Sequence, residues 1–204
     1  RAIERRYASA ALAETYPGET YPVDNAAALA ALALHARATH AAPSAALANG
    51  LAAMRAAIDP ATGLLAQSLA SDGRRGPARG SGTALAAYFL SYADVTTSAA
   101  LWRALETSQL RTVIGFGAVL EQADGSSRGD VDSGPVLFGF GVSATGFALG
   151  ASRAHGDRDA FRALYATAHL FGAPRDGAFT TGGPLGDAIL FAMTTAPRAA
   201  EEKS

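Results

Sequence analysis

The hydrophobic and polar positions of this chain follow helical spacing over most of its length. The segment 81–93 shows the pattern through Leu85, Tyr88, Phe89 and Tyr92. Residues three and four apart lie on the same side of an α-helix, so these side chains form one apolar face. Similar patterns predict helices over residues 2–15, 25–40, 44–58, 81–93, 97–110, 133–153, 158–171 and 184–195. We therefore expect helix to be the main secondary structure.

Residues with capping chemistry mark several of the expected helix ends. Asn25 and Asp157 each stand at the start of a helical pattern. Their side-chain oxygens can accept hydrogen bonds from the first backbone N–H groups of a helix. Pro184 suits the first turn of the last helix, where a backbone N–H has no partner within the helix. We expect helices to begin at or beside these residues.

Two stretches interrupt the helical pattern. Residues 61–80 contain the turn pairs Thr62-Gly63 and Asp72-Gly73 around a short apolar run, which predicts a small two-stranded hairpin or an extended loop. Residues 114–132 contain an alternating run over 116–121, which is typical of a strand. We expect both stretches to be insertions between helices.

The expected helices follow a plan that repeats about every 50 residues. Each unit has a loop with acidic, Gly and Pro residues, then a helix of small and apolar residues, then a more charged helix. The loops are 21–25, 76–81, 129–135 and 181–187. Such repeats indicate an array of similar helix pairs. The sequence predicts an all-α fold, an α/α toroid or partial toroid of about four helical hairpins with short β-hairpin insertions. Residues 1–196 would form this one domain, complete or part of a longer ring, and 197–204 a disordered tail.

Composition excludes several classes of function. The net charge is -1 and Lys203 is the only lysine, so no basic stripe is available and we expect no nucleic-acid partner. The chain has no cysteine, which excludes disulfides, thiolate zinc sites and cysteine nucleophiles. Both an extracytoplasmic and a cytoplasmic location are compatible with this composition.

The segment from Ser133 to Ser152 carries no charge and approaches the roughly 20 residues that a membrane-spanning helix needs. It contains five glycines, however, and an acidic loop precedes it. A buried helix in close contact with its neighbours explains both features better. We therefore expect no membrane span.

The repeating loops carry most of the candidate chemistry. If the small, apolar helices all run in the same direction, their N-terminal loops meet at one end of the fold. Charged side chains distant in sequence would then come together, namely Asp24, Arg79, Asp130, Asp132 and Asp187. Each aspartate has an alternative structural role, because a carboxylate at a helix N-terminus can cap the helix.

This plan of loops and helices resembles the α/α-toroid enzymes of the six-hairpin glycosidase-like superfamily, whose relatives include polysaccharide lyases, epimerases and linalool dehydratase-like proteins. The resemblance implies hydrolysis or elimination on a small-molecule or oligosaccharide substrate. A full ring of six helix pairs would need about 300 residues at this period. If the ring of this chain is open, a partner chain or a missing segment would cover its edge.

We expect the acid and base among four carboxylates, Asp24, Asp130, Asp132 and Glu121. Asp130 and Asp132 are two residues apart before a helix, where they could act as acid and base or bind a cation. Glu121 lies at the end of the extended run and could project over the mouth of the fold, the end at which the N-terminal loops would meet.

A second group of side chains could position the substrate. Tyr21 and Glu19 belong to an aromatic and acidic cluster that also includes Tyr16, and aromatic rings offer apolar faces to a sugar. Arg79, with Arg75, could hold the carboxylate of an acidic sugar or neutralise the aspartates. Asp187 is the corresponding residue of the last loop.

Alternatives remain open at this point. The loop around Asp130 lacks the further acidic ligands of an EF-hand, and no cofactor or metal is predicted. An acid-base enzyme for a terpenoid would need a pocket lined by Phe138, Phe140 and Tyr88, and the absence of cysteine weakens this hypothesis. A non-catalytic helical scaffold would have a filled mouth in which each aspartate caps its own helix.

Overall fold

The computed structural model describes residues 2–9, 12–129 and 134–199. In these residues the chain forms eight helices and eight short strands. The helices are α1 (Ala2–Ser9), α2 (Pro22–Ala38), α3 (Ala45–Ala56), α4 (Gly80–Leu90), α5 (Val95–Ser108), α6 (Val142–Ala154), α7 (Arg158–Gly172) and α8 (Gly183–Thr194). The strands are β1 (Glu19–Thr20), β2 (Leu69–Ala70), β3 (Leu110–Val113), β4 (Phe116–Val119), β5 (Val136–Leu137), β6 (Phe140–Gly141), β7 (Pro174–Arg175) and β8 (Ala178–Phe179).

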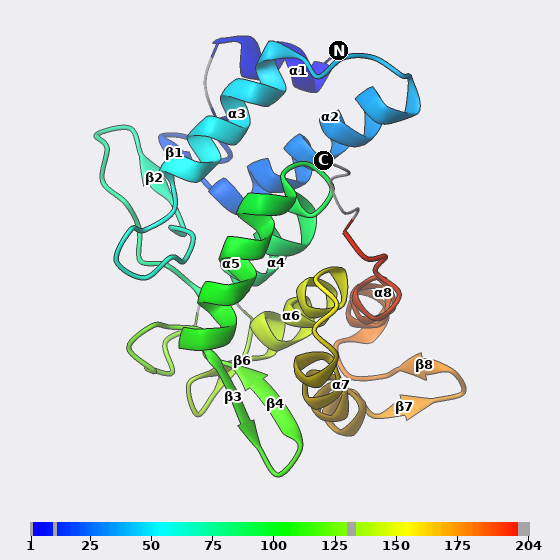
Figure 1. Cartoon of the computed structure of the whole chain (residues 1–204). Helices are drawn as coiled ribbons and strands as arrows, with labels where there is room; N and C mark the ends of the chain where they lie inside the picture. Colours follow the sequence, from blue (N-terminus) through cyan, green and yellow to red (C-terminus); the bar gives the residue numbers. More distant parts are fainter. Residues whose placement is uncertain (1, 10–11, 130–133, 200–204) are drawn as a thin grey trace.

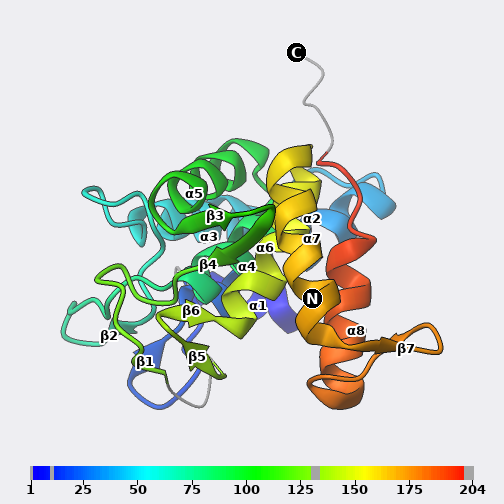
Figure 2. The same cartoon turned by 90° about the horizontal axis from the view of Figure 1, so that it is seen from below.

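The prediction of an all-α fold is wrong, because the structure is a mixture of helices and strands. The strands of the described residues pair as four separate two-stranded antiparallel sheets, β1–β2, β3–β4, β5–β6 and β7–β8. The β7–β8 hairpin projects from the α7–α8 end of the molecule in both views (Figures 1 and 2).

The helices pack in two layers, which can be followed in Figure 1 from blue to red. In one layer α2 contacts α4, α4 contacts α6, and α6 contacts α8. In the other, α3, α5 and α7 pack on α2, α4 and α6, while α1 lies against α2 and α3. One hydrophobic core runs through these contacts, from Tyr7 in α1 to Met193 in α8. The outer side of α8 is open, since Leu185 is 71% and Phe191 67% exposed.

Three hairpins share a two-residue turn whose second residue is glycine. The turns are Ile114-Gly115, Phe138-Gly139 and Asp176-Gly177, and both residues of each have positive φ. Type I′ turns require this geometry, and their twist matches that of the two strands. The hairpin at Phe138 explains why the helix predicted over 133–153 is wrong at its start: β5 and β6 take up 136–141, and α6 begins only at Val142.

The stretch 61–80 folds back on itself, as the predicted hairpin or extended loop would, since isolated antiparallel bridges join Ala66 to Ala78 and Leu69 to Arg75. Its strand β2 also pairs with β1, which lies far away in sequence. One further local prediction needs correction. Helix α2 begins at Pro22 and not at Asn25, so Asn25 lies inside the helix. Its buried amide bonds to the chain around it and caps no helix end.

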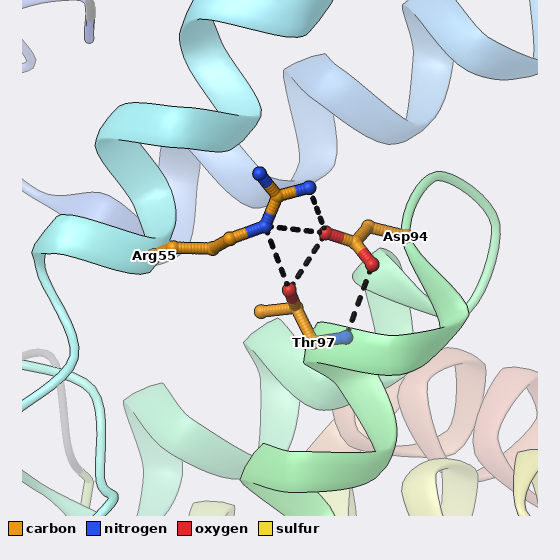
Figure 3. Close-up of polar contacts among 3 residues, drawn as sticks. All are labelled: Arg55, Asp94 and Thr97. Carbon is orange, nitrogen blue, oxygen red and sulfur yellow. Dashed lines mark hydrogen bonds and ion pairs between the residues drawn. The ribbon is translucent and has the colours of Figure 1, made fainter.

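Predicted capping by Asp157 is confirmed, since its side chain accepts a hydrogen bond of 3.0 Å from the N–H of Ala160. Asp94 caps α5 in the same way and also joins α5 to α3 (Figure 3). Its carboxylate accepts from the N–H of Thr97 at 3.0 Å, from Thr97 Oγ1 at 2.6 Å and from Arg55 Nη2 at 2.7 Å. Burial raises the pKa of Asp94, but the hydrogen bonds from Thr97 and Arg55 and the charge of Arg55 outweigh it and lower the pKa below its usual value.

Among the described residues, no helix is both long enough and apolar enough to cross a membrane.

Candidate functional site

A pocket of about 230 Å³ lies where the N-terminal ends of α2 and α4 approach α6. Its walls come from four separate parts of the chain, namely the loop before α2 with the first turn of α2, the stretch before α4, the first turns of α4, and α6. The described lining residues are Tyr16, Tyr21, Val23, Asp24, Gln67, Ser81, Gly82, Leu85 and Phe147. The pocket therefore combines apolar surface, three aromatic rings and a small number of polar groups, as ligand sites commonly do.

The two tyrosines form one wall of the pocket. The rings of Tyr16 and Tyr21 meet edge to face, with their centroids 5.3 Å apart. The hydroxyl of Tyr21 donates a hydrogen bond of 3.2 Å to Glu19 Oε2, and its backbone N–H donates to Thr15 Oγ1 at 3.3 Å. These contacts fix the ring of Tyr21 beside the start of α2.

Glu121 lies behind the part of the pocket wall that Ser81 forms. This residue is fully buried, and Ser81 Oγ donates a hydrogen bond of 2.6 Å to its Oε1 atom. Its backbone carbonyl accepts from the N–H of Gly80 at 2.9 Å, and its Oε2 atom lies so close to Gly141 that a Cβ there would collide with it. The carboxylate thus sits beside the first residues of α4 and α6, whose helix dipoles favour negative charge.

Gln67 contributes a buried acceptor to the pocket. Among the described residues, its Oε1 atom has no hydrogen-bond partner although it is shielded from solvent. The atom lies against the first turn of α4, since a Cβ on Gly82 would be only 3.1 Å from it. A buried polar atom without a hydrogen bond is destabilising, and a ligand that donates to it would remove this cost.

Five of the predicted site residues fall into three groups. Tyr21 and Asp24 line the pocket, and Asp24 is exposed there. Glu121 and Glu19 are each one hydrogen bond away from a lining residue. Asp187 belongs elsewhere, because its Oδ1 atom accepts a hydrogen bond of 2.7 Å from the N–H of Phe179 and so braces the β7–β8 hairpin.

The remaining predicted residues are not among the described residues that line the pocket. Arg79 directly precedes α4, where its backbone bridges to Gln122, but it is not among the described residues that line the cavity. Arg75 points elsewhere, with Nη1 3.4 Å from the carbonyl oxygen of Ile58. Asp130 and Asp132 lie outside the described residues.

Asp24 also borders a second cavity, of about 380 Å³, between α1 and α2. Tyr7 lines it and donates a hydrogen bond of 2.6 Å to Asn25 Oδ1. Burial raises the pKa of Tyr7 to about 12, and the negative charge of Asp24 adds to this effect. Asn25 ties this region together, since it also accepts from the N–H of Ala13 and donates to the carbonyl of Tyr21.

Sequence reasoning missed Gln67, Ser81 and Phe147. Gln67 and the neighbouring Ser68 are the only polar residues in an apolar run over 64–70, and such an exception is a weak signal of a functional residue. Ser81 closes one of the repeating loops but looks there like an ordinary turn residue. The three side chains come from the stretch before α4, from α4 and from α6, and only the tertiary structure brings them to one pocket.

No protein-family model matches this chain, and no curated protein is significantly similar to it in sequence. The function must therefore be argued from the pocket itself.

Proposed function

We propose that this protein is a carbohydrate-active enzyme, of the glycoside hydrolase or lyase type, that binds a sugar unit in the pocket between α2, α4 and α6. Asp24 would donate or accept the proton in the reaction. Tyr16 and Tyr21 would hold the apolar face of the sugar, and Ser81, held by Glu121, would bind one of its hydroxyls.

The observation that carries this proposal is the composition of the pocket. It places three aromatic rings, one carboxylate and two neutral polar side chains around a single cavity. Sugars present apolar faces for aromatic contact and hydroxyls for hydrogen bonds, and a carboxylate is a suitable general acid or base. At about 230 Å³ the cavity is below the roughly 300 Å³ at which pockets for drug-sized ligands begin, which suits about one sugar ring.

A glycoside hydrolase usually needs two carboxylates on either side of the scissile bond. Asp24 supplies one, and Glu121 lies one hydrogen bond behind the pocket wall through Ser81. Asp130 and Asp132 stay predicted partners for Asp24. A relationship to the six-hairpin glycosidase-like superfamily also stays a prediction, as does a partner chain or further segment over the open side of α8.

The experiment is a screen of oligosaccharides and polysaccharides with two readouts. Release of reducing ends reports hydrolysis, and the ultraviolet absorbance of an unsaturated product reports elimination. On any substrate that is turned over, Asp24→Asn should lower kcat by about 10²–10⁴-fold, the usual contribution of a general acid or base.

Asp159→Asn is the matched control, because the Asp159 side chain is 97% exposed on α7 and faces Arg162. It should keep the activity of the unchanged protein. If Asp24→Asn is as active as this control, Asp24 is not the acid or base. If nothing in the screen is turned over by the folded protein, the proposal of a carbohydrate-active enzyme fails.

The two alternatives have less support. The terpenoid hypothesis needs Phe138, Phe140 and Tyr88 around one cavity, but Phe138 is 94% exposed at a hairpin turn and none of the three lines the pocket. The scaffold hypothesis needs a filled mouth with every aspartate capping its own helix. Two observations disfavour it: a pocket is present, and Asp187 bonds to the β7–β8 hairpin.

A further inference from the structure

The layer formed by α2, α4, α6 and α8 ends at α8, which stands at the edge of the molecule in both views (Figures 1 and 2). α8 packs on α6 through the side that carries Met193, which lies against Gly150. Each residue advances a helix by about 100°, so other residues of α8 lie on the opposite side. These residues are exposed and apolar. We call them the outer stripe of α8: Pro184, Ala188 and Phe191.

The outer stripe has the spacing of a contact between two helices. Its residues are four and three positions apart, as are the residues that meet between paired helices. The small side chain of Ala188 stands between two larger ones and leaves room for a side chain of a second helix. Phe191 is 67% exposed, and Leu185 beside the stripe is 71% exposed. A connected apolar surface of this kind is typical of an interaction site.

The layer itself indicates which kind of helix fits the outer stripe. Its four helices consist mainly of small and apolar residues, and they pack side by side in the order α2, α4, α6, α8. The outer stripe faces the position that the next helix of this layer would occupy. A helix in that position should therefore also be small and apolar. The α8 helix of a second copy has this composition and the same uncovered side.

Charge also favours the pairing of α8 with itself. In a two-fold contact the same surface of both chains meets, so a charged residue would face its own copy. The outer stripe carries no charge. The charged residue of α8 is Asp187, whose Oδ1 atom accepts a hydrogen bond from the N–H of Phe179. A head-to-tail contact is less suitable, because α1 already lies against α2 and α3 at the other end of the array.

We infer that the outer stripe of α8 is the interface of a symmetric dimer, in which α8 of one chain packs antiparallel against α8 of a second copy. The two layers of small helices then become one continuous layer. Antiparallel helices also place the positive end of one helix dipole beside the negative end of the other. None of the described residues that line the pocket lies on α8, so the inference does not rest on the proposed function.

The mass of the whole chain in solution tests this inference. Sedimentation equilibrium should give the mass of two chains at high protein concentration, and dilution should return the mass of one. Phe191→Glu brings like charges into the interface and should raise the Kd of the dimer by about 100-fold or more. Val113→Glu is the matched control, because Val113 is 66% exposed on the β3–β4 hairpin. It should dimerise like the unchanged protein.

Three results would overturn the inference. The unchanged protein could have the mass of one chain at every concentration. Phe191→Glu could dimerise as well as the control. The mass could rise beyond two chains with concentration, which would indicate a head-to-tail assembly that does not close.

A cysteine cross-link locates the contact independently. The chain has no cysteine of its own. Ala188 lies near the middle of α8, so in an antiparallel pair it comes close to its own copy. Ala188→Cys should form a disulfide between two chains under mild oxidation. Ala52→Cys, at an exposed alanine of α3, should not. A dimer in which Ala52→Cys cross-links as readily as Ala188→Cys would contradict the interface described here.

Discussion

Individual side chains join helices that are distant in sequence, and Asp94 is the clearest case. It caps α5 through Thr97 and bonds to Arg55 of α3 (Figure 3). The carboxylate is only 10% exposed, whereas the side chain of Arg55 is 55% exposed. The cap is thus well shielded from water, but the ion pair is partly screened and contributes less than the cap to the stability of the fold.

The lowered pKa of Asp94 predicts how its contribution depends on pH. A carboxyl whose pKa is lower in the folded state stabilises above its unfolded pKa of about 3.9, and this stability is lost as the pH falls through the folded pKa. Asp94→Asn keeps an amide oxygen for the cap but loses the charge. It should lower the free energy of unfolding by about 1 kcal/mol near pH 7, and the difference should shrink below about pH 4.

Denaturant unfolding at several pH values measures this difference. Asp176→Asn is the control, because Asp176 is exposed at a hairpin turn and both residue types tolerate its positive φ. A deficit of Asp94→Asn that is the same at pH 3 and pH 7 would contradict the role given to the charge.

At the same scale, only part of the candidate site could be predicted from sequence. Tyr21 directly precedes the helix of small residues and Asp24 lies in its first turn, and such helix ends meet when the helices pack side by side. Glu121 could be placed on an extended run, but its burial depends on the first residues of α4 and α6. Tertiary contacts of this kind leave no local pattern in the sequence.

At the scale of elements, the close packing of α6 depends on its small residues. A Cβ on Gly150 would collide with Met193 of α8 and would lie 3.0 Å from Tyr88 of α4. One turn earlier, the nearest atom to a Cβ on Gly146 would be Leu190 Cδ2, at 4.0 Å. Two glycines of one helix thus have opposite surroundings.

This contrast predicts opposite effects for two alanine substitutions. Gly150→Ala should lower the free energy of unfolding by about 1–3 kcal/mol, because the added methyl overfills the contact between α4, α6 and α8. Gly146→Ala should raise it by about 0.5–1 kcal/mol, because alanine favours the helix and has room. Thermal and denaturant unfolding of both variants measure these changes. If Gly150→Ala is stabilising as well, the helices do not pack as described.

Most helices were predicted within a few residues, because their apolar positions keep the helical period. Short hairpin insertions and a strand over 116–121 were also predicted, but the three two-residue hairpin turns were missed for a different reason. Ile114-Gly115 and Phe138-Gly139 lack the Asn-Gly or Asp-Gly pair that usually marks a type I′ turn. Asp176-Gly177 has that pair, but its two flanking strands have only two residues each, too few to show an alternating pattern.

For the whole molecule, the core predicts cooperative unfolding. One cluster of buried residues connects α1 with α8, and Trp102, the only tryptophan, lies within it at 3% exposure. Fluorescence of Trp102 therefore reports the core, while far-ultraviolet circular dichroism reports all the helices. The two signals should change at the same denaturant concentration. Separate transitions would mean that the two ends of the helical array unfold independently.

The whole-molecule arrangement was predicted in part. Alternation of apolar and charged helices follows from the repeat, but the all-α classification was wrong because short strands fill the connections. The exposed outer side of α8 marks the edge where the sequence predicts a partner chain or a further segment, and that remains a prediction.

The central claim is that the pocket between α2, α4 and α6 binds a sugar. The most direct measurement is a map of backbone amide chemical shifts while a neutral monosaccharide is added to the protein. The account predicts that the largest changes occur at Tyr21, Gln67, Ser81 and Gly82, which line the pocket. Changes confined to the cavity between α1 and α2 would contradict it. The absence of any change up to the highest sugar concentration would also contradict it.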